Sequence, residues 1–179
     1  MIHDLELVER LSAYSPIAFN GRVFRATPKS LSPLTASVSG GRWMPKGGAS
    51  ILYTSCEREG ALAELAFHWA QYNPLPSYPA SLYGISLTAQ RTFRLLRADL
   101  ESLDVHWSKY NETDYMRTQQ IGAAVAFLEC DGLIVPSARW PCENLMLFMD
   151  HHRIDSNRLE VVSTEEVDWL SWARKNGIV

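Results

Sequence analysis

The spacing of apolar positions divides the chain into helices and strands. Apolar residues recur every three or four positions in some segments and every second position in others, which are the periods of an amphipathic helix and a half-buried strand. Helices are predicted over residues 3–14, 57–72, 111–129 and 164–175. Strands are predicted over residues 22–26, 50–54, 80–87, 92–97, 133–136, 144–149 and 158–162.

Turn and capping residues set the ends of several elements. Ser15-Pro16 ends the first helix, because the residue before a proline avoids the helical conformation. Ser163 and Glu166 form a capping-box pattern, so the last helix is expected to begin at residue 164. Residues 27–49 are rich in Ser, Pro and Gly and show little periodicity. A long irregular segment of this kind in a compact domain is often functional.

The order of the elements favours a single α+β domain. The 179 residues contain no repeat, linker or break in composition. Strands and helices are mixed without a strict β-α-β rhythm, which favours a mixed sheet with flanking helices over a doubly wound parallel sheet. We therefore expect one mixed α/β domain over residues 1–179, in which 1–19 hold an N-terminal helix and 153–179 a C-terminal strand and helix.

Charge and apolar content argue against two function classes. The formal net charge is −3, whereas a general nucleic-acid binder carries a basic excess. The longest apolar stretch, residues 121–128, is too short to span a bilayer, and the N-terminus has no secretory signal, so a cytoplasmic location is expected. Arg22, Arg25 and Arg42 could still form a local site for a phosphorylated small molecule.

Motifs of the common cofactor, metal and nucleophile sites are missing. No GxGxxG, GxxxxGK[ST] or GxSxG occurs. Cys56, Cys130 and Cys142 lack CxxC spacing, which predicts free thiols in a reducing cytosol and no metal site. His151 and His152 are expected on a solvated turn, since adjacent side chains point in different directions and rarely bind one metal.

The helix predicted over residues 57–72 has two distinct faces. An apolar stripe at helical spacing is formed by Leu62, Leu65, Ala66 and Trp69. Glu64 lies on a different face, together with Ala61 and His68. This carboxylate is therefore either exposed on a solvated face or held in a cleft.

Three segments place polar residues beside apolar ones. In Gly40–Trp43, paired glycines would allow a close backbone approach, and Arg42 could bind a phosphate or a carboxylate. Tyr53 ends a predicted strand ahead of the helix that carries Glu64. Ser137 follows a buried strand, where ligand sites of open sheets often form. The plainer interpretations are a surface loop, a solvated helix face and a serine that caps a turn.

Together these segments resemble the RES domain, a family named for its Arg, Glu and Ser. The matching segments are GRVFR at 21–25, GGRW-x-P at 40–45, ILYTS at 51–55, ALAEL at 61–65, QQIG at 119–122, GLIVPS at 132–137 and ENL-x-L at 143–147. The resemblance covers residues 20–152. The chain departs from the family pattern at Met44 and at residues 138–142, which intervene before the Glu-Asn segment.

The resemblance implies the fold of ADP-ribosyltransferases and the role of the toxin in a bacterial toxin–antitoxin pair. Such toxins inhibit growth by cleaving the nicotinamide–ribose bond of NAD+ through hydrolysis or phosphorolysis. NAD+ is then a substrate, and no metal is expected. The implied partner is an Xre-family helix-turn-helix antitoxin that occludes the active site. The implied assembly is a toxin–antitoxin hetero-oligomer or a toxin homodimer. The toxin itself is expected to contact neither nucleic acid nor a membrane.

The resemblance also implies a set of site residues. The catalytic residues would be Arg42, Tyr53, Glu64 and Ser137, and the NAD+-binding residues Arg25, Arg42, Trp43 and Asn144. Residue chemistry fits this assignment, because the Glu64 carboxylate could stabilise positive charge on the ribose. A guanidinium such as that of Arg42 could hold the pyrophosphate.

Other functions are compatible with the same residues. A protein ADP-ribosyltransferase would use the same site with a different acceptor. A non-catalytic binding module would keep the pocket only for the antitoxin. An RNA-cleaving toxin is disfavoured by the acidic balance and by the lack of a His/Lys/Arg cluster.

Overall fold

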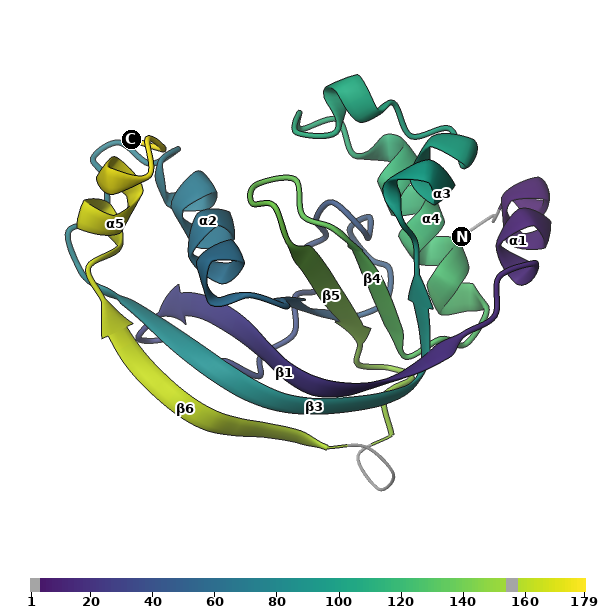
Figure 1. Cartoon of the computed structure of the whole chain (residues 1–179), viewed down its shortest axis with the longest axis horizontal. Coiled ribbons are helices and arrows are strands. Elements are labelled where there is room, and N and C mark those ends of the chain that lie inside the picture. The colour runs from purple at the N-terminus through teal and green to yellow at the C-terminus, as the bar shows by residue number, and fades with distance from the viewer. Residues whose placement is uncertain (1–3, 154–157) are drawn as a thin grey trace.

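The computed structural model describes residues 4–153 and 158–179 and contains one sheet with helices packed against it (Figure 1). The strands are β1 (Ile17–Pro28), β2 (Ile51–Ser55), β3 (Ala80–Arg94), β4 (Gly132–Pro136), β5 (Glu143–Phe148) and β6 (Leu159–Val167). The helices are α1 (Leu5–Ser12), α2 (Arg58–Trp69), α3 (Arg97–Ser102), α4 (Met116–Phe127) and α5 (Trp169–Lys175), with a short 3₁₀ helix η1 (Trp107–Lys109). The predicted mixed α+β fold is confirmed.

The sheet closes on itself. Its strand order is β1-β2-β5-β4-β3-β6, and β1 pairs with β3 as well as with β2. The pairing of β3 with β4 is parallel, and the other pairs are antiparallel. The side chains of Leu52, Ile85 and Leu147 are fully buried in the core that these strands enclose. Closure leaves few exposed strand edges and gives a rigid scaffold for a site.

The pairing of β1 changes along its length. β1 pairs with β3 from Ile17 to Pro28, but in register with β2 only at Phe24, opposite Ser55. Beyond Phe24 the two strands diverge, and residues 29–50 connect them without a regular strand. The site described below lies at this divergence.

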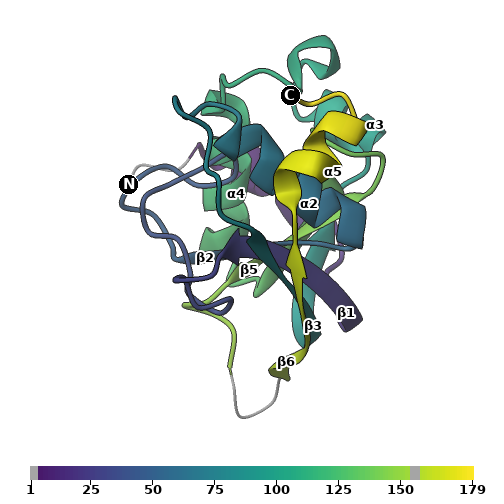
Figure 2. The same ribbon diagram turned by 90° about the vertical axis from the view of Figure 1, so that its left-hand side faces the viewer.

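Helices lie in two groups above the long curved ribbon of β1, β3 and β6 (Figure 1). The group of α2 and α5 is nearest the viewer in Figure 2 and packs around the edge-to-face rings of Trp69 and Trp169, whose centroids are 5.1 Å apart. The group of α1, α3 and α4 encloses a separate core with Leu11 and Ile121 at its centre. Among the described residues, no helix is long and apolar enough to cross a membrane.

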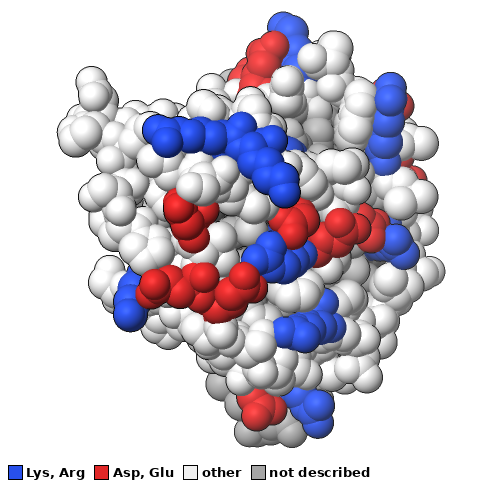
Figure 3. Space-filling model, turned by 60° about the vertical axis from the view of Figure 1, so that its left-hand side comes forward, with Lys and Arg blue, Asp and Glu red and all other residues white. Residues whose placement is uncertain are grey.

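The side of the molecule shown in Figure 3 carries interspersed acidic and basic side chains rather than one basic face. Arg58 of α2 forms ion pairs with Glu59 and with Glu165 of β6, and Lys29 lies 3.6 Å from Glu166. Exposed pairs such as these contribute about 0–1 kcal/mol each. Their significance is that positive charge on this side is already matched by carboxylates.

The prediction of separate strands over residues 80–87 and 92–97 is wrong. β3 is one continuous strand, because β1 pairs with it as far as Thr92. The end of the second predicted strand instead lies in α3, which begins at Arg97. The sequence analysis did not predict α3 or η1, both too short to establish a helical period.

The predicted start of the last helix is also wrong. Ser163 and Glu166, whose spacing suggested a capping box, lie in β6 and pair with β3. Helix α5 begins after Asp168, whose side chain accepts a hydrogen bond from the Ser171 N–H at 3.0 Å. Pairing with a long partner strand therefore overrides a local capping signal.

The first helix is confirmed, and α1 ends at Ser12, ahead of Ser15-Pro16. Its predicted first residue, His3, lies outside the described residues. The helix predicted over 111–129 is shorter than expected and begins at Met116. The long irregular segment is confirmed, with only isolated bridges within it.

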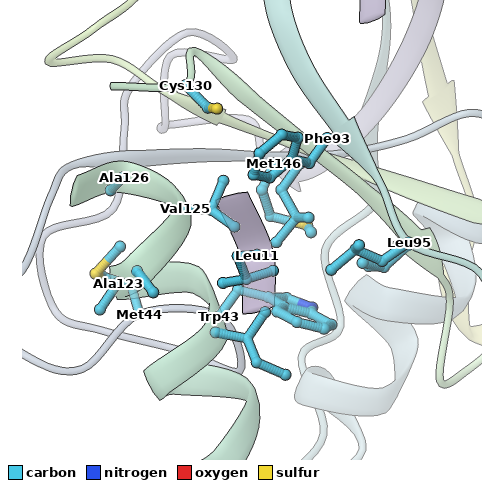
Figure 4. Close-up of a cluster of buried hydrophobic side chains, with 14 of the residues drawn as sticks. Leu11, Trp43, Met44, Phe93, Leu95, Ala123, Val125, Ala126, Cys130 and Met146 are labelled. Carbon is cyan, nitrogen blue, oxygen red and sulfur yellow. The ribbon is translucent and has the colours of Figure 1, made fainter. Parts of the chain in front are cut away.

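The irregular segment is held in place by α4. Thr118 donates a hydrogen bond to the Arg42 carbonyl at 2.7 Å, and Gln119 donates one to the Gly41 carbonyl at 2.9 Å. The next residue, Trp43, is 2% exposed and packs among the side chains of this core (Figure 4). The segment 40–43 is therefore an anchored part of the domain and not a free surface loop.

Gly122 makes this docking possible. A Cβ placed on Gly122 would lie 1.8 Å from the carbonyl oxygen of Trp43, far inside van der Waals contact. Backbone atoms occupy the space that a side chain would need, and they cannot move without shifting segment 40–43. The glycine of the QQIG motif is thus explained by close packing.

Gly122→Ala is expected to lower the free energy of unfolding by about 2 kcal/mol, the usual range for over-packing. Helix propensity alone predicts the opposite sign, a gain of about 1 kcal/mol for Gly→Ala inside a helix. Urea unfolding of the wild type and the variant distinguishes the two. A variant as stable as the wild type, or more stable, would show that the contact between α4 and Trp43 is not tight.

Candidate active site

The divergence of β1 from β2 opens a pocket of about 360 Å³. Its walls come from β1, the irregular segment, β2, α2, β5 and the loop between β4 and β5. Three guanidinium groups line it, those of Arg25, Arg42 and Arg139, against a single carboxylate, that of Glu64. This excess of positive charge favours an anionic ligand.

Strand alternation places two of the predicted residues on one face of the sheet. β2 and β5 are antiparallel, with Tyr53 opposite Met146 and Ser55 opposite Asn144. Because side chains two apart on a strand share a face, Tyr53 and Asn144 both face the pocket, whose lining includes each of them. The intervening Leu145 points into the enclosed core of the sheet.

Glu64 is the point where three segments meet. Its Oε1 accepts a hydrogen bond from the Ser137 hydroxyl at 3.0 Å and from the Asn144 amide at 2.7 Å. Glu64 comes from α2, Ser137 follows β4, and Asn144 lies in β5. Within the described residues, no hydrogen bond reaches the other carboxylate oxygen, Oε2, which leaves it able to contact a ligand.

The hydrogen bonds of the Ser137 hydroxyl are all made within the protein. Its hydroxyl donates to Glu64 and accepts from the backbone N–H groups of Arg139 and Trp140, at 3.1 and 3.3 Å. These contacts use the donor and both acceptor positions of the hydroxyl. The structure therefore gives Ser137 the role of orienting the carboxylate.

Arg42 is held rigidly by a short segment that follows η1. It donates to the carbonyls of Tyr110 at 2.6 Å and of Glu112 at 3.1 Å. Its guanidinium lies over the rings of Tyr110 and Tyr115, at 5.2 and 4.5 Å from their centroids. Burial lowers the pKa of Arg42, and nearby phenol groups offset part of that effect.

Tyr53 presents a buried hydroxyl whose oxygen lies near the Trp43 backbone N–H but whose O–H has no acceptor among the described residues. Burial raises its pKa to about 12, so the phenol remains a donor at neutral pH. A Cβ on Gly41 would lie 2.7 Å from this hydroxyl, so only glycine allows the contact. The second glycine of the GGRW segment thus keeps room for Tyr53, while the first, Gly40, adopts a positive φ of 86°.

Unsatisfied buried polar atoms gather in this pocket. Besides the Tyr53 hydroxyl, the Oδ1 of Asn144 and the Nη1 of Arg25 lack partners among the described residues. Burial also lowers the pKa of Arg25 to about 10. A buried polar atom without a partner costs about 1–3 kcal/mol, so three of them lining one pocket indicate groups that a ligand satisfies.

Two residues that the sequence analysis assigned to ligand binding, Trp43 and Arg22, have their side chains elsewhere. Trp43 borders the pocket, but its ring is packed in the core around α4. Arg22 does not reach the pocket, because it lies over the Phe24 ring and contacts the Ser163 hydroxyl. A local basic site is therefore formed by Arg25 and Arg42 without Arg22.

The histidine pair lies outside the pocket. His152 is 6% exposed, and its Nε2 lies 2.9 Å from the Thr88 carbonyl, so the expectation of a solvated turn is wrong for this residue. The turn at Asp150 is held to Ser50, whose N–H and hydroxyl both donate to the Asp150 carboxylate. The three cysteines are free, and no group of His, Cys, Asp and Glu in residues 4–153 and 158–179 could hold a metal ion.

The pocket is also lined by residues that the sequence analysis did not assign to it. With side chains that could contact a ligand through a ring or a charge, Phe67, His68, Tyr115 and Arg139 are among the lining residues that were not assigned. His68 follows Glu64 by one helical turn, and the sequence analysis placed both on one helix face without giving His68 a role. Desolvation and the charges of Arg139 and Arg42 lower the pKa of His68, against the opposing effect of Glu64. Tyr115 and Arg139 come from irregular segments whose paths no local pattern predicts.

The arrangement suits a ligand that is both anionic and electron-poor at one carbon. Guanidinium groups can bind phosphates, and the fixed carboxylate of Glu64 can stabilise positive charge that develops beside it. The phenol of Tyr53 and the amide oxygen of Asn144 add one hydrogen-bond donor and one acceptor at the same wall.

Comparisons with known proteins bear on the fold and on the family of the chain. A chain of the crystal structure of the M. tuberculosis MbcT-MbcA toxin–antitoxin complex superposes with a TM-score of 0.78 at 18% identity, covering 96% of this chain and 97% of that chain. At 18% sequence identity, this structural similarity establishes only that the two chains share a fold. No curated protein matches the sequence significantly. The family model of the RES domain, however, matches residues 21–170, and the chain therefore belongs to the RES domain family.

Proposed function

We propose that this protein is the toxin of a bacterial toxin–antitoxin pair and inhibits growth by cleaving the nicotinamide–ribose bond of NAD+. The observation that carries the proposal is the fixed carboxylate of Glu64 in a pocket to which Arg25, Arg42 and Arg139 bring guanidinium groups. Membership of the RES domain family and a fold shared with a chain of a toxin–antitoxin complex support it.

Glu64 would act on the charge that develops during cleavage. The bond between the nicotinamide nitrogen and ribose C1′ breaks, and its electron pair returns to the ring, which leaves as neutral nicotinamide. Positive charge then spreads over C1′ and the ring oxygen of the ribose. The Oε2 of Glu64, with Oε1 held by Ser137 and Asn144, would stabilise this charge or bind a ribose hydroxyl.

The remaining site residues would bind and orient NAD+. Arg42 would hold the pyrophosphate, and the buried unpartnered guanidinium of Arg25 is a second phosphate ligand. Tyr53 would pack against the nicotinamide or donate to the ribose, while the free Oδ1 of Asn144 would accept a hydrogen bond from the same part of NAD+. Trp43 would fix the backbone of Arg42 from within the core.

The acceptor completes the reaction. Water adds to C1′ and loses a proton to give ADP-ribose, whereas phosphate gives an ADP-ribose phosphate. A protein nucleophile at the same position would make the chain an ADP-ribosyltransferase, and a pocket kept only for a partner would make it a binding module. Retention of an oriented carboxylate favours a catalytic role over the binding module.

The proposed partner is an Xre-family helix-turn-helix antitoxin that occludes the pocket. Such a toxin acts in the cytoplasm, where NAD+ is abundant, and leaves DNA binding to the antitoxin. The interspersed charges of the face in Figure 3 fit a toxin with no nucleic-acid contact of its own. A toxin–antitoxin hetero-oligomer is the assembly that we expect, with a toxin homodimer as the alternative.

Glu64→Gln is expected to lower the rate of nicotinamide release from NAD+ by about 100-fold or more, since the charge that opposes the ribosyl cation is lost. Release is followed chromatographically with purified protein. Glu57→Gln is the matched control, because Glu57 is exposed just before α2 and does not line the pocket. Equal release by the wild type and Glu64→Gln would contradict the proposal.

The acceptor is identified by the products formed with and without inorganic phosphate. Mass spectrometry should detect ADP-ribose in phosphate-free buffer if water is the acceptor, and a phosphorylated ADP-ribose if phosphate is required. If ADP-ribose is found attached to a protein and no free ADP-ribose is released, the reaction is protein ADP-ribosylation and not NAD+ degradation. Expression of the wild type, but not of Glu64→Gln, is expected to arrest bacterial growth.

Ser137→Ala is expected to lower kcat by about 10- to 100-fold, the value of a hydrogen bond to a charged group. KM should change little, because the hydroxyl is used by Glu64 and by the backbone of its own loop. Ser102→Ala, which removes an exposed hydroxyl from α3, serves as the control. A rise in KM with unchanged kcat would show instead that Ser137 binds the substrate directly.

A further inference from the structure

Three consecutive backbone carbonyls beside the pocket accept hydrogen bonds from pocket arginines. Arg42 donates to the carbonyls of Tyr110 and Glu112, at 2.6 and 3.1 Å. Arg139 donates to the carbonyl between them, that of Asn111, at 2.6 Å. Two guanidinium groups from distant parts of the sequence are therefore gathered on one short segment, residues 110–112.

The backbone of Arg139 is fixed by its own loop. Its N–H donates to the Ser137 hydroxyl, the same hydroxyl that holds Glu64. The neighbouring Trp140 rests against Trp172 of α5, with ring centroids 5.7 Å apart. The start of the side chain is thus anchored beside the Glu64 carboxylate, and its guanidinium is held separately, by the Asn111 carbonyl.

The guanidinium of Arg139 reaches across the pocket. It lies over the ring of Phe67 on α2, 3.3 Å from the centroid, and also contacts Asn111 on the opposite side. Both Phe67 and Arg139 line the pocket. A ligand that occupies the space between α2 and residues 110–112 must therefore lie against this guanidinium.

The present partners of the two arginines are weaker acceptors than a phosphate. Carbonyl oxygens are neutral, whereas hydrogen bonds from guanidinium to phosphate have charge on both partners and are shorter and stronger. The two guanidinium groups are also close enough to repel, since the charge of Arg139 contributes, after burial, to the lowered pKa of Arg42. An anion placed between them removes that repulsion.

We propose that Arg139 is a substrate-binding residue that, with Arg42, clamps the pyrophosphate of the dinucleotide, while the carbonyls of residues 110–112 hold both guanidinium groups in place before substrate arrives. The assignment rests on the proposed function, because it takes NAD+ as the substrate. It gives Arg139 a contact with the phosphates and none with the bond that breaks.

The first experiment compares steady-state kinetics with NAD+ and with nicotinamide riboside, which has the same scissile bond but no phosphate. For Arg139→Gln, KM for NAD+ should rise about tenfold or more, with kcat altered less than about threefold. The kcat/KM for nicotinamide riboside should fall far less than the kcat/KM for NAD+, because nicotinamide riboside offers no phosphate to Arg139. Arg139→Lys keeps the charge but loses the planar fork, and an intermediate KM is expected.

The control is Arg174→Gln, which removes the same charge from an exposed position on α5 outside the pocket. The Tm of each variant shows whether it is folded. A fall in kcat of Arg139→Gln with both substrates would mean that Arg139 only supports Ser137 and Glu64, and would overturn the inference. An unchanged KM for NAD+ would overturn it as well, with the proposed function intact.

Binding of ADP-ribose, measured by calorimetry, tests the clamp without any turnover. ADP-ribose contains the pyrophosphate but no nicotinamide, and Arg139→Gln should bind it about tenfold more weakly than the wild type. Equal affinities would overturn the inference. If the variant binds ADP-ribose more weakly but the wild type releases no nicotinamide from NAD+, the role of Arg139 in pyrophosphate binding is supported and only the proposed reaction is contradicted.

Discussion

The close contact between α4 and the backbone of Trp43 is the constraint on which the site depends. Gly122 lets the Trp43 carbonyl approach the helix, and Thr118 and Gln119 hold the two preceding carbonyls. This docking fixes the direction of Arg42 and brings Gly41 against the Tyr53 hydroxyl. An irregular segment is thereby made as rigid as the strands around it, which is what an oriented binding site requires.

The second organising feature is the hydrogen-bonded group of Glu64, Ser137 and Asn144. The three residues are far apart in sequence and are brought together by α2, the end of β4 and β5. Because Ser137 also accepts the N–H of Arg139, the carboxylate and the anion-binding side of the pocket share one anchor. Displacement of that loop would disturb both charge stabilisation and substrate binding.

Much of this site could be predicted from the sequence, and the reason differs between residues. Local signals, namely a glycine pair, a strand end and an isolated carboxylate, marked Arg42, Tyr53 and Glu64 only as candidates. The resemblance to the RES domain grouped them into one site. Tyr110 and Arg139 were not identified, since their positions follow from long-range packing of irregular segments. The same limit explains the fold: α2 and β2 follow local periodicity, whereas the late start of α5 is set by the pairing of β6 with β3.

The closed sheet also determines when during synthesis the pocket can form. β1 is completed early in translation but pairs mainly with β3, more than fifty residues later, and Asn144 of β5 is the last of the proposed site residues to leave the ribosome. Contacts between such distant segments form slowly and late in folding. A nascent chain therefore carries Arg25, Arg42 and Glu64 long before β5 supplies Asn144, and the hydrogen-bonded group around Glu64 cannot form until then.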